Sequence, residues 1–79
     1  MRIISQNRES DVNYDKCSIE YDHDENGKHV VFADFTYGET VRTGISLGIY
    51  VSKERCLQVM EYIRSSYSYG SQLYLMPEE

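Results

Sequence analysis

The chain contains no tryptophan, a single proline and only two cysteines, and it lacks any long hydrophobic run. A helix that spans a bilayer needs about 20 consecutive apolar residues, and a secretory signal needs a shorter apolar core near its start. Neither pattern occurs among the 79 residues, so we expect a cytoplasmic protein with no membrane contact. Because the cytoplasm keeps thiols reduced, Cys17 and Cys56 are expected to stay unpaired.

Clustered basic residues are also missing. The chain has 13 acidic and 8 basic residues, a net charge of −5, and no group of lysines and arginines larger than a lone pair. Binding to a phosphate backbone depends on several clustered cations, so we expect no direct nucleic-acid binding. An acidic surface usually serves solubility, but it also suits docking on a basic protein surface, including one that normally holds nucleic acid.

The motifs of common catalytic and phosphate-binding sites are absent as well. The chain carries no G-x-S-x-G, no P-loop and no G-x-G-x-x-G. A chain this short buries only about 60–65% of the surface of its unfolded form, which leaves little room for an internal active site. Cys56 lies near the start of the predicted helix but on its apolar side, which favours a core residue over a nucleophile. The sequence therefore predicts a protein that is not an enzyme and holds no cofactor.

What the chain does contain is a series of strand-like segments followed by one helix. Segments rich in β-branched and aromatic residues predict strands at residues 2–5, 17–22, 29–37 and 41–51. From Lys53 to Arg64 apolar residues recur every three or four positions, which predicts an amphipathic helix. Ser52 is placed to cap its start and Gly70 to end it, after the polar SSYSY has lost helical character. Residues 72–76, before Pro77, predict a short closing strand.

These elements predict one α+β domain over residues 1–79. Its architecture is an antiparallel β-meander of about four strands, with the amphipathic C-terminal helix packed on one face of the sheet. In the strand at residues 41–51 the apolar residues Val41, Ile45, Leu47, Ile49 and Val51 all stand at odd positions. Because successive side chains of a strand point to opposite faces, the odd positions are expected to form the core face.

This parity predicts the length of both hairpin loops, because a slip of one residue would turn all the apolar side chains of a strand outward. Residues 25–27 are expected to form a three-residue loop that ends with Gly27 in the left-handed region. Gly38, Glu39 and Thr40 are expected to form a second three-residue connection. The resulting pairs are Tyr21 with Val31, Ile19 with Ala33, Cys17 with Phe35, Tyr37 with Val41, Ala33 with Ile45, and Val31 with Leu47.

The even face of this sheet is the candidate interface. It carries polar residues, but also an apolar group next to two strand glycines: Val30, Phe32, Gly44, Gly48 and Tyr50. One helix cannot cover both faces, so this group is expected to bind a partner, in the simplest case a second copy of the chain in a two-fold homodimer. The alternative is that the closing strand or the segment around Tyr14 folds over it.

The predicted hairpin tip at residues 22–27 resembles the first half of a calcium-binding loop, with oxygen donors at alternate positions before Gly27. The second half fails, because the position that should supply a bidentate glutamate is Ala33 and the flanking segments are strands. We therefore interpret the tip as an ordinary polar turn. His23 and His29 flank it without the spacing of a zinc or nickel site, and we expect solvated histidines and no bound metal.

The opening MRIISQ, followed by an Asp-x-x-Tyr segment from Asp11 to Tyr14, resembles small uncharacterised proteins of phages and mobile elements in Gram-positive bacteria. Ser52 and the stretch VMEYIR from Val59 to Arg64 extend the resemblance over most of the chain. Asn13 departs from it, where those proteins have proline. The resemblance implies a mobile-element accessory protein, and it brings no activity, ligand or catalytic residue.

The sequence thus favours a non-enzymatic protein-interaction module of phage or mobile-element type. The eight tyrosines support this hypothesis, because so small a core cannot bury them all and tyrosine is enriched at protein interfaces. The alternative is an acidic inhibitor that occupies the nucleic-acid-binding surface of a host protein. The identity of the partner is not encoded in any motif of the chain.

Overall fold

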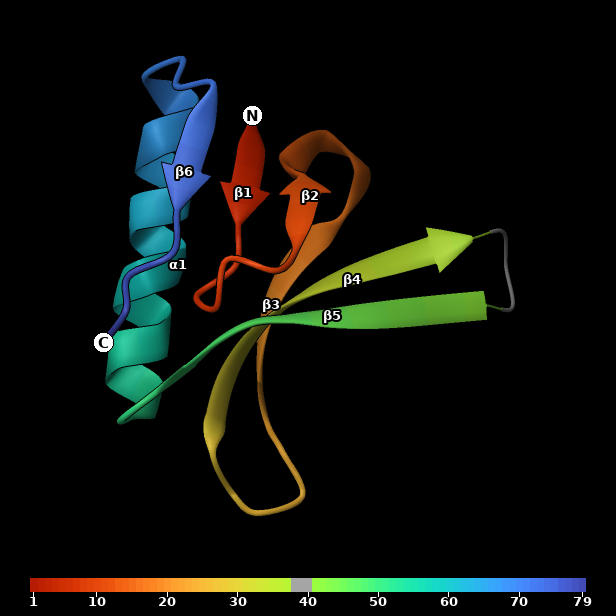
Figure 1. Ribbon diagram of the computed structural model, residues 1–79, viewed down its shortest axis with the longest axis vertical. Coiled ribbons are helices and arrows are strands. Elements are labelled where there is room, and N and C mark those ends of the chain that lie inside the picture. The colour runs from red at the N-terminus through yellow and green to blue at the C-terminus, as the bar shows by residue number, and fades with distance from the viewer. Residues whose placement is uncertain (38–40) are drawn as a thin grey trace.

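The computed structural model describes residues 1–37 and 41–79, and it has the expected α+β composition (Figure 1). Two three-stranded sheets share one helix. The antiparallel β3-β4-β5 meander is the larger sheet, and the smaller sheet has the order β2-β1-β6. The elements are β1 (Arg2–Ile4), β2 (Asp11–Asn13), a 3₁₀ turn (Tyr14–Lys16), β3 (Ser18–His23), β4 (His29–Tyr37), β5 (Val41–Tyr50), α1 (Lys53–Ser68) and β6 (Leu73–Leu75).

The smaller sheet corrects the expected four-stranded meander. The first strand does not join the meander: β1 pairs antiparallel with β2 and parallel with the closing strand β6. The β2 segment, Asp11–Asn13, is a strand that the sequence pattern does not predict. Its three residues are too few to show an alternating pattern, and only Val12 is apolar. Val12 is buried with Ile3 of β1, so tertiary packing defines this strand.

The core lies where the two sheets and the helix meet. Its fully or almost fully buried side chains come from both sheets, the helix and the C-terminal segment: Ile3, Val12, Val31, Ala33, Leu47, Tyr50, Cys56, Val59, Ile63 and Met76. In Figure 1 the helix and β6 lie side by side at one edge, with β1 and β2 next to them and the larger sheet extending away. The expected helix-covered face of the meander is therefore confirmed, and the smaller sheet packs against the same core.

The helix begins as the sequence predicts and ends later. The Ser52 hydroxyl accepts a hydrogen bond from the Arg55 amide at 3.1 Å, the expected N-cap. The helix continues to Ser68, through residues that were expected to leave it, because Tyr67 stacks on Tyr14 with 4.7 Å between ring centroids. Such tertiary contacts outweigh the weak helix preference of serine. Gly70, with φ of 82°, then ends the helix as expected.

The first hairpin has the predicted register. Tyr21 lies opposite Val31 and Ile19 opposite Ala33. Gly27 takes a φ of 77°, and the Asp24 amide donates to the Lys28 carbonyl at 2.9 Å, which closes the three-residue loop. The second connection, at residues 38–40, lies outside the described residues.

The second hairpin departs from the prediction through a β-bulge. Ala33 pairs with Ile45 as expected, but Val31 pairs with Gly48 and not with Leu47, so Leu47 is an extra residue in β5. After the bulge the facing of β5 is reversed. Ile49 and Val51, expected in the core, are 44% and 90% exposed.

The reversal places Tyr50 in the core, where only 5% of it is exposed. Its hydroxyl donates to the Pro77 carbonyl at 2.9 Å, which holds the C-terminal segment against β5. Burial raises the pKa of this phenol to about 12. A Cβ added to Gly48 would lie 2.7 Å from the Tyr50 hydroxyl, so the ring needs a glycine beneath it.

Gln6 joins the two sheets at the bulge. Its backbone amide donates to the Leu47 carbonyl at 2.6 Å. Its side-chain amide pairs with the backbone of Ile49, accepting from the N–H at 2.9 Å and donating to the carbonyl at 3.1 Å. The glutamine thus acts as a short extra strand at the edge of β5.

The bulge predicts opposite outcomes for two glycines of β5. Gly48→Ala should lower the free energy of unfolding by about 1–3 kcal/mol, because the new methyl group overlaps the Tyr50 ring, which its bond to Pro77 prevents from moving aside. Gly44→Ala is the matched control, because the nearest atom to its Cβ would be 3.6 Å away, at ordinary contact distance. Chemical denaturation measures both. Equal effects would contradict the bulge, since strict alternation gives the two glycines the same facing.

The helix contributes Cys56, Val59 and Ile63 to the core, all fully buried, and Ile63 is the largest of the three. Ile63→Ala should cost about 2–5 kcal/mol of stability, because it leaves a cavity between the helix and the sheet. The control is Leu57→Ala on the same helix, where 44% of the side chain is exposed and the cost should stay within about 0.5 kcal/mol. Similar losses for the two variants in urea denaturation would show that the helix packs through another face.

Candidate functional site

The face of the larger sheet that points away from α1 is open to solvent. Gly44, Ser46 and Ile49 of β5 are exposed there, and Phe32 of β4 is half-buried. The Phe32 ring lies 3.6 Å from the position of a Cβ on Gly44, so the ring covers this glycine. Val30 of β4 lies on the same side but is buried, with 8% of it exposed. We call the residues Val30, Phe32, Gly44, Ser46 and Ile49 the open face.

This arrangement corrects part of the expected interface. Val30, Phe32 and Gly44 lie on the open face as predicted, whereas Gly48 and Tyr50 belong to the core side because of the bulge. The bulge brings Ile49 directly opposite Val30, which adds an exposed apolar side chain that the sequence analysis placed in the core. The two glycines inside this strand indicate a bulge or a close approach of another backbone, but the register prediction kept strict alternation and so missed the reversal.

The segments expected as alternative covers of this face pack elsewhere. Tyr14 stacks on Tyr67 of the helix, and the closing strand β6 pairs with β1 in the smaller sheet. A shallow hollow of about 250 Å³ therefore lies on the open face. Its lining combines Val30, Phe32 and Gly44 with the polar residues Asp22, His23, Asp24 and Ser46.

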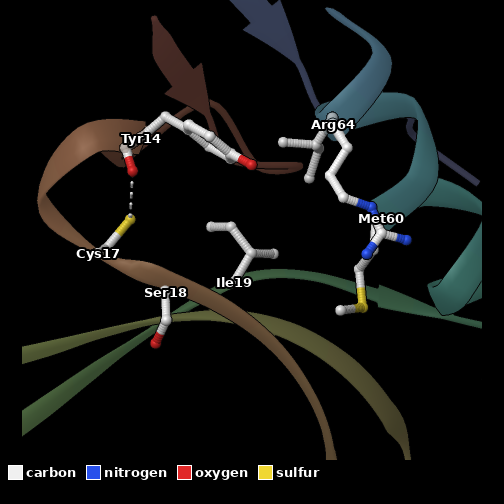
Figure 2. A pocket seen from close by; sticks show the side chains of 7 residues that line it. Tyr14, Cys17, Ser18, Ile19, Met60 and Arg64 are labelled. Atoms are coloured by element: carbon white, nitrogen blue, oxygen red, sulfur yellow. Dashed lines mark hydrogen bonds between the residues drawn. The ribbon is translucent and has the colours of Figure 1, made fainter. Parts of the chain in front are cut away.

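A second hollow, of about 200 Å³, lies between β3 and the helix (Figure 2). Tyr14, Ile19 and Met60 give it apolar walls, with Arg64 at its rim. Cys17 also lines this hollow and carries a thiol, the strongest nucleophile type among these residues. The thiol donates to the Asn13 carbonyl at 3.4 Å, and burial raises its pKa. A neutral thiol is a poor nucleophile, so this hollow offers no activated group for catalysis.

Cys56 is the other free thiol, and it lies in the core as expected. It is fully buried, and its burial raises its pKa as well. The expected unpaired state of both cysteines is therefore confirmed in the structure.

The hairpin tip is a turn held by Asp24. One oxygen of this carboxylate accepts hydrogen bonds from the amides of Asn26 and Lys28, both at 2.8 Å. Within residues 1–37 and 41–79, no group of three or more histidines, cysteines, aspartates or glutamates is arranged to hold a metal ion. The same part of the chain contains no helix that is long and apolar enough to cross a membrane.

The two histidines beside the tip are not independent solvated side chains. The Tyr21 hydroxyl lies 3.0 Å from Nε2 of His23 and 2.8 Å from Nδ1 of His29. The two imidazole rings lie 5.2 Å apart between centroids. Tyr21, His23 and His29 all stand at odd positions, so alternation places them on one face of the hairpin, but only the ring orientations show that they contact one another.

Comparison with known proteins assigns no family: no protein-family model matches the chain, and neither a curated protein nor a solved structure matches it. The resemblance to proteins of phages and mobile elements therefore stays a prediction.

The turn at the tip predicts no response to calcium. Titration with micromolar calcium should leave the amide signals of residues 22–28 without saturable shifts, because the Asp24 oxygen is occupied by two backbone amides. Asp24→Ala should lower stability by about 1–2 kcal/mol, since both amides lose their acceptor. Nuclear magnetic resonance and urea denaturation measure the two effects. A neutral Asp24→Ala together with saturable calcium shifts would assign Asp24 to a metal site instead.

Proposed function

We propose that the chain is a non-enzymatic protein-interaction module of mobile-element type that acts in the cytoplasm by self-association through the open face. The observation that carries this proposal is the placement of Phe32. Its large apolar side chain stands on the solvent side of the sheet, flanked by Val30 and above the exposed glycine Gly44. Aromatic side chains in such positions are typical centres of protein interfaces.

A second copy of the chain is the partner that best suits this face. A domain of 79 residues has a thin core, and pairing two open faces buries the same apolar patch twice. Closed two-fold pairing is the commonest arrangement of soluble homo-oligomers. It brings Phe32 of one copy toward Phe32 or Ile49 of the other, because the patch must complement itself.

The acidic inhibitor is the second candidate, and one observation favours it. The hollow on the open face has Asp22 and Asp24 in its lining, and the lining residues that the structure describes include no lysine or arginine. A lysine or arginine of a basic protein surface would fit between these carboxylates, next to the Phe32 ring. Binding of this kind should weaken steeply with salt, whereas apolar self-association should not.

Light-scattering mass tests the leading proposal. The wild-type chain at high micromolar concentration should have a mass near twice 9.3 kDa. Phe32→Glu should be monomeric, because it places a charge at the centre of the apolar contact. Leu57→Glu is the matched control, since Leu57 is an exposed apolar residue on the helix, and it should remain dimeric.

Two outcomes would reject self-association through this face. One is a wild-type mass of 9.3 kDa at high micromolar concentration, and the other is equal dissociation of the Phe32→Glu and Leu57→Glu variants. A monomer that binds a lysine-rich peptide, and that loses it between 50 and roughly 300 mM salt, would instead support the acidic inhibitor.

A further inference from the structure

Three donor atoms converge next to the β3–β4 hairpin tip. They are the Tyr21 hydroxyl oxygen, Nε2 of His23 and Nδ1 of His29, with the oxygen 3.0 and 2.8 Å from the two nitrogens. A neutral hydroxyl has one proton, so it can donate to one ring nitrogen and must accept from the other. The two imidazoles and the phenol therefore form one connected group rather than separate side chains.

The hairpin geometry holds the two histidines together. His23 and His29 are direct cross-strand partners, next to the Asp24 and Lys28 pair that is hydrogen-bonded. Because hydrogen-bonded and non-hydrogen-bonded pairs alternate along an antiparallel ladder, the histidines form a non-hydrogen-bonded pair, in which side chains come closest. The turn at Gly27 fixes this pairing.

The spacing of these donors fits one metal ion. Two donors that are each about 2.0–2.1 Å from a metal lie about 2.9 Å apart at a right angle, and about 3.4 Å apart at the tetrahedral angle. The observed oxygen-to-nitrogen separations of 2.8 and 3.0 Å are hydrogen-bond distances of the metal-free chain, and they show that the three donors lie close enough together to converge on one ion.

We propose that Tyr21, His23 and His29 form a binding site for a divalent transition-metal ion, with copper(II) preferred over nickel(II) and zinc(II). The donor set is two imidazole nitrogens and one phenolate oxygen, completed by solvent. Imidazole suits all three ions, and copper(II) binds such sites most tightly in the general order of divalent metals.

Binding exchanges a proton for the metal ion. The phenol releases its proton to solvent when its oxygen becomes a ligand, and no electron transfer is involved. Partial burial raises the pKa of Tyr21, and the negative charges of Asp22 and Glu54 add to the increase. The same two carboxylates also attract a cation. Because the metal ion competes with the phenol proton for the Tyr21 oxygen, the metal affinity should rise with pH.

One neighbouring group opposes the ion. The ammonium of Lys53, at the start of the helix, lies 5.4 Å from the centroid of the Tyr21 ring. Its positive charge lowers the affinity of any cation held at the phenol oxygen. Lys53→Gln should therefore bind copper(II) more tightly than the wild type, an effect that a metal bound elsewhere on the chain would not show.

The experiment is a titration of the metal-free chain with copper(II) alone, followed by calorimetry and visible absorption. The wild type should bind one ion per chain and develop a phenolate-to-copper charge-transfer band. His23→Ala and His29→Ala should each lower the affinity at least about tenfold, because each removes a ligand. Tyr21→Phe should abolish the band while the two histidines still bind weakly.

Tyr62→Phe is the matched control, because Tyr62 is an exposed tyrosine on the helix, and it should keep both the band and the affinity. Far-UV circular dichroism checks that each variant is folded, and Tyr21→Phe keeps the ring that packs beside the sheet. Unchanged binding in both histidine variants would place the metal elsewhere and overturn the proposal. A wild type that does not bind one copper(II) ion per chain would overturn the three-donor site as well. The same holds if binding depends on the histidines but produces no phenolate-to-copper charge-transfer band.

Discussion

The fold depends on the extra residue that Leu47 adds to β5. Before the bulge, the odd positions of this strand face the helix, and after it the even positions do. Tyr50 thereby enters the core and holds the C-terminal segment through its bond to Pro77, while Ile49 turns to the open face. Because Val31 pairs with Gly48, the Tyr50 ring finds room above a residue without a side chain. One inserted residue therefore decides both what the core contains and what the protein presents to a partner.

The bulge also explains how a second sheet can join the meander. A bulge disturbs the regular ladder, and Gln6 satisfies the edge of β5 there with three hydrogen bonds, one to Leu47 and two to Ile49. This pairing protects the edge from other chains and directs β1 to the core side, where Ile3 is fully buried. The MRIISQ opening thus has a structural role in this chain: one of its isoleucines fills the core and its glutamine joins the sheets.

The elements predicted correctly are those with strong local signals. The register of the first hairpin followed from alternation and from Gly27, and the start of the helix followed from Ser52. A strand glycine such as Gly48 is a local mark of a bulge. Which residue is the extra one, and the existence of β2, depend on contacts between distant parts of the chain, which a local pattern does not contain. For the candidate site, alternation predicted the facing of Val30 and Phe32 correctly. It predicted the wrong facing for Gly48, Ile49 and Tyr50, because these residues follow the bulge. The link between Tyr21 and the histidines required the actual ring orientations.

The proposed metal site lies on the β3–β4 hairpin, whose tip projects away from the smaller sheet (Figure 1), and β4 of this hairpin also carries Val30 and Phe32 of the open face. Alternation separates them, because Tyr21 faces the helix side of the sheet while Phe32 stands on the open face. His23 belongs to both, since it is one of the three metal donors and also lines the hollow beside Phe32. A metal ion that fixes His23 therefore changes the rim of the surface offered to a second copy. Because binding free energies are linked, a metal ion that changes the affinity of the chain for a second copy requires that dimerisation change the metal affinity by the same factor.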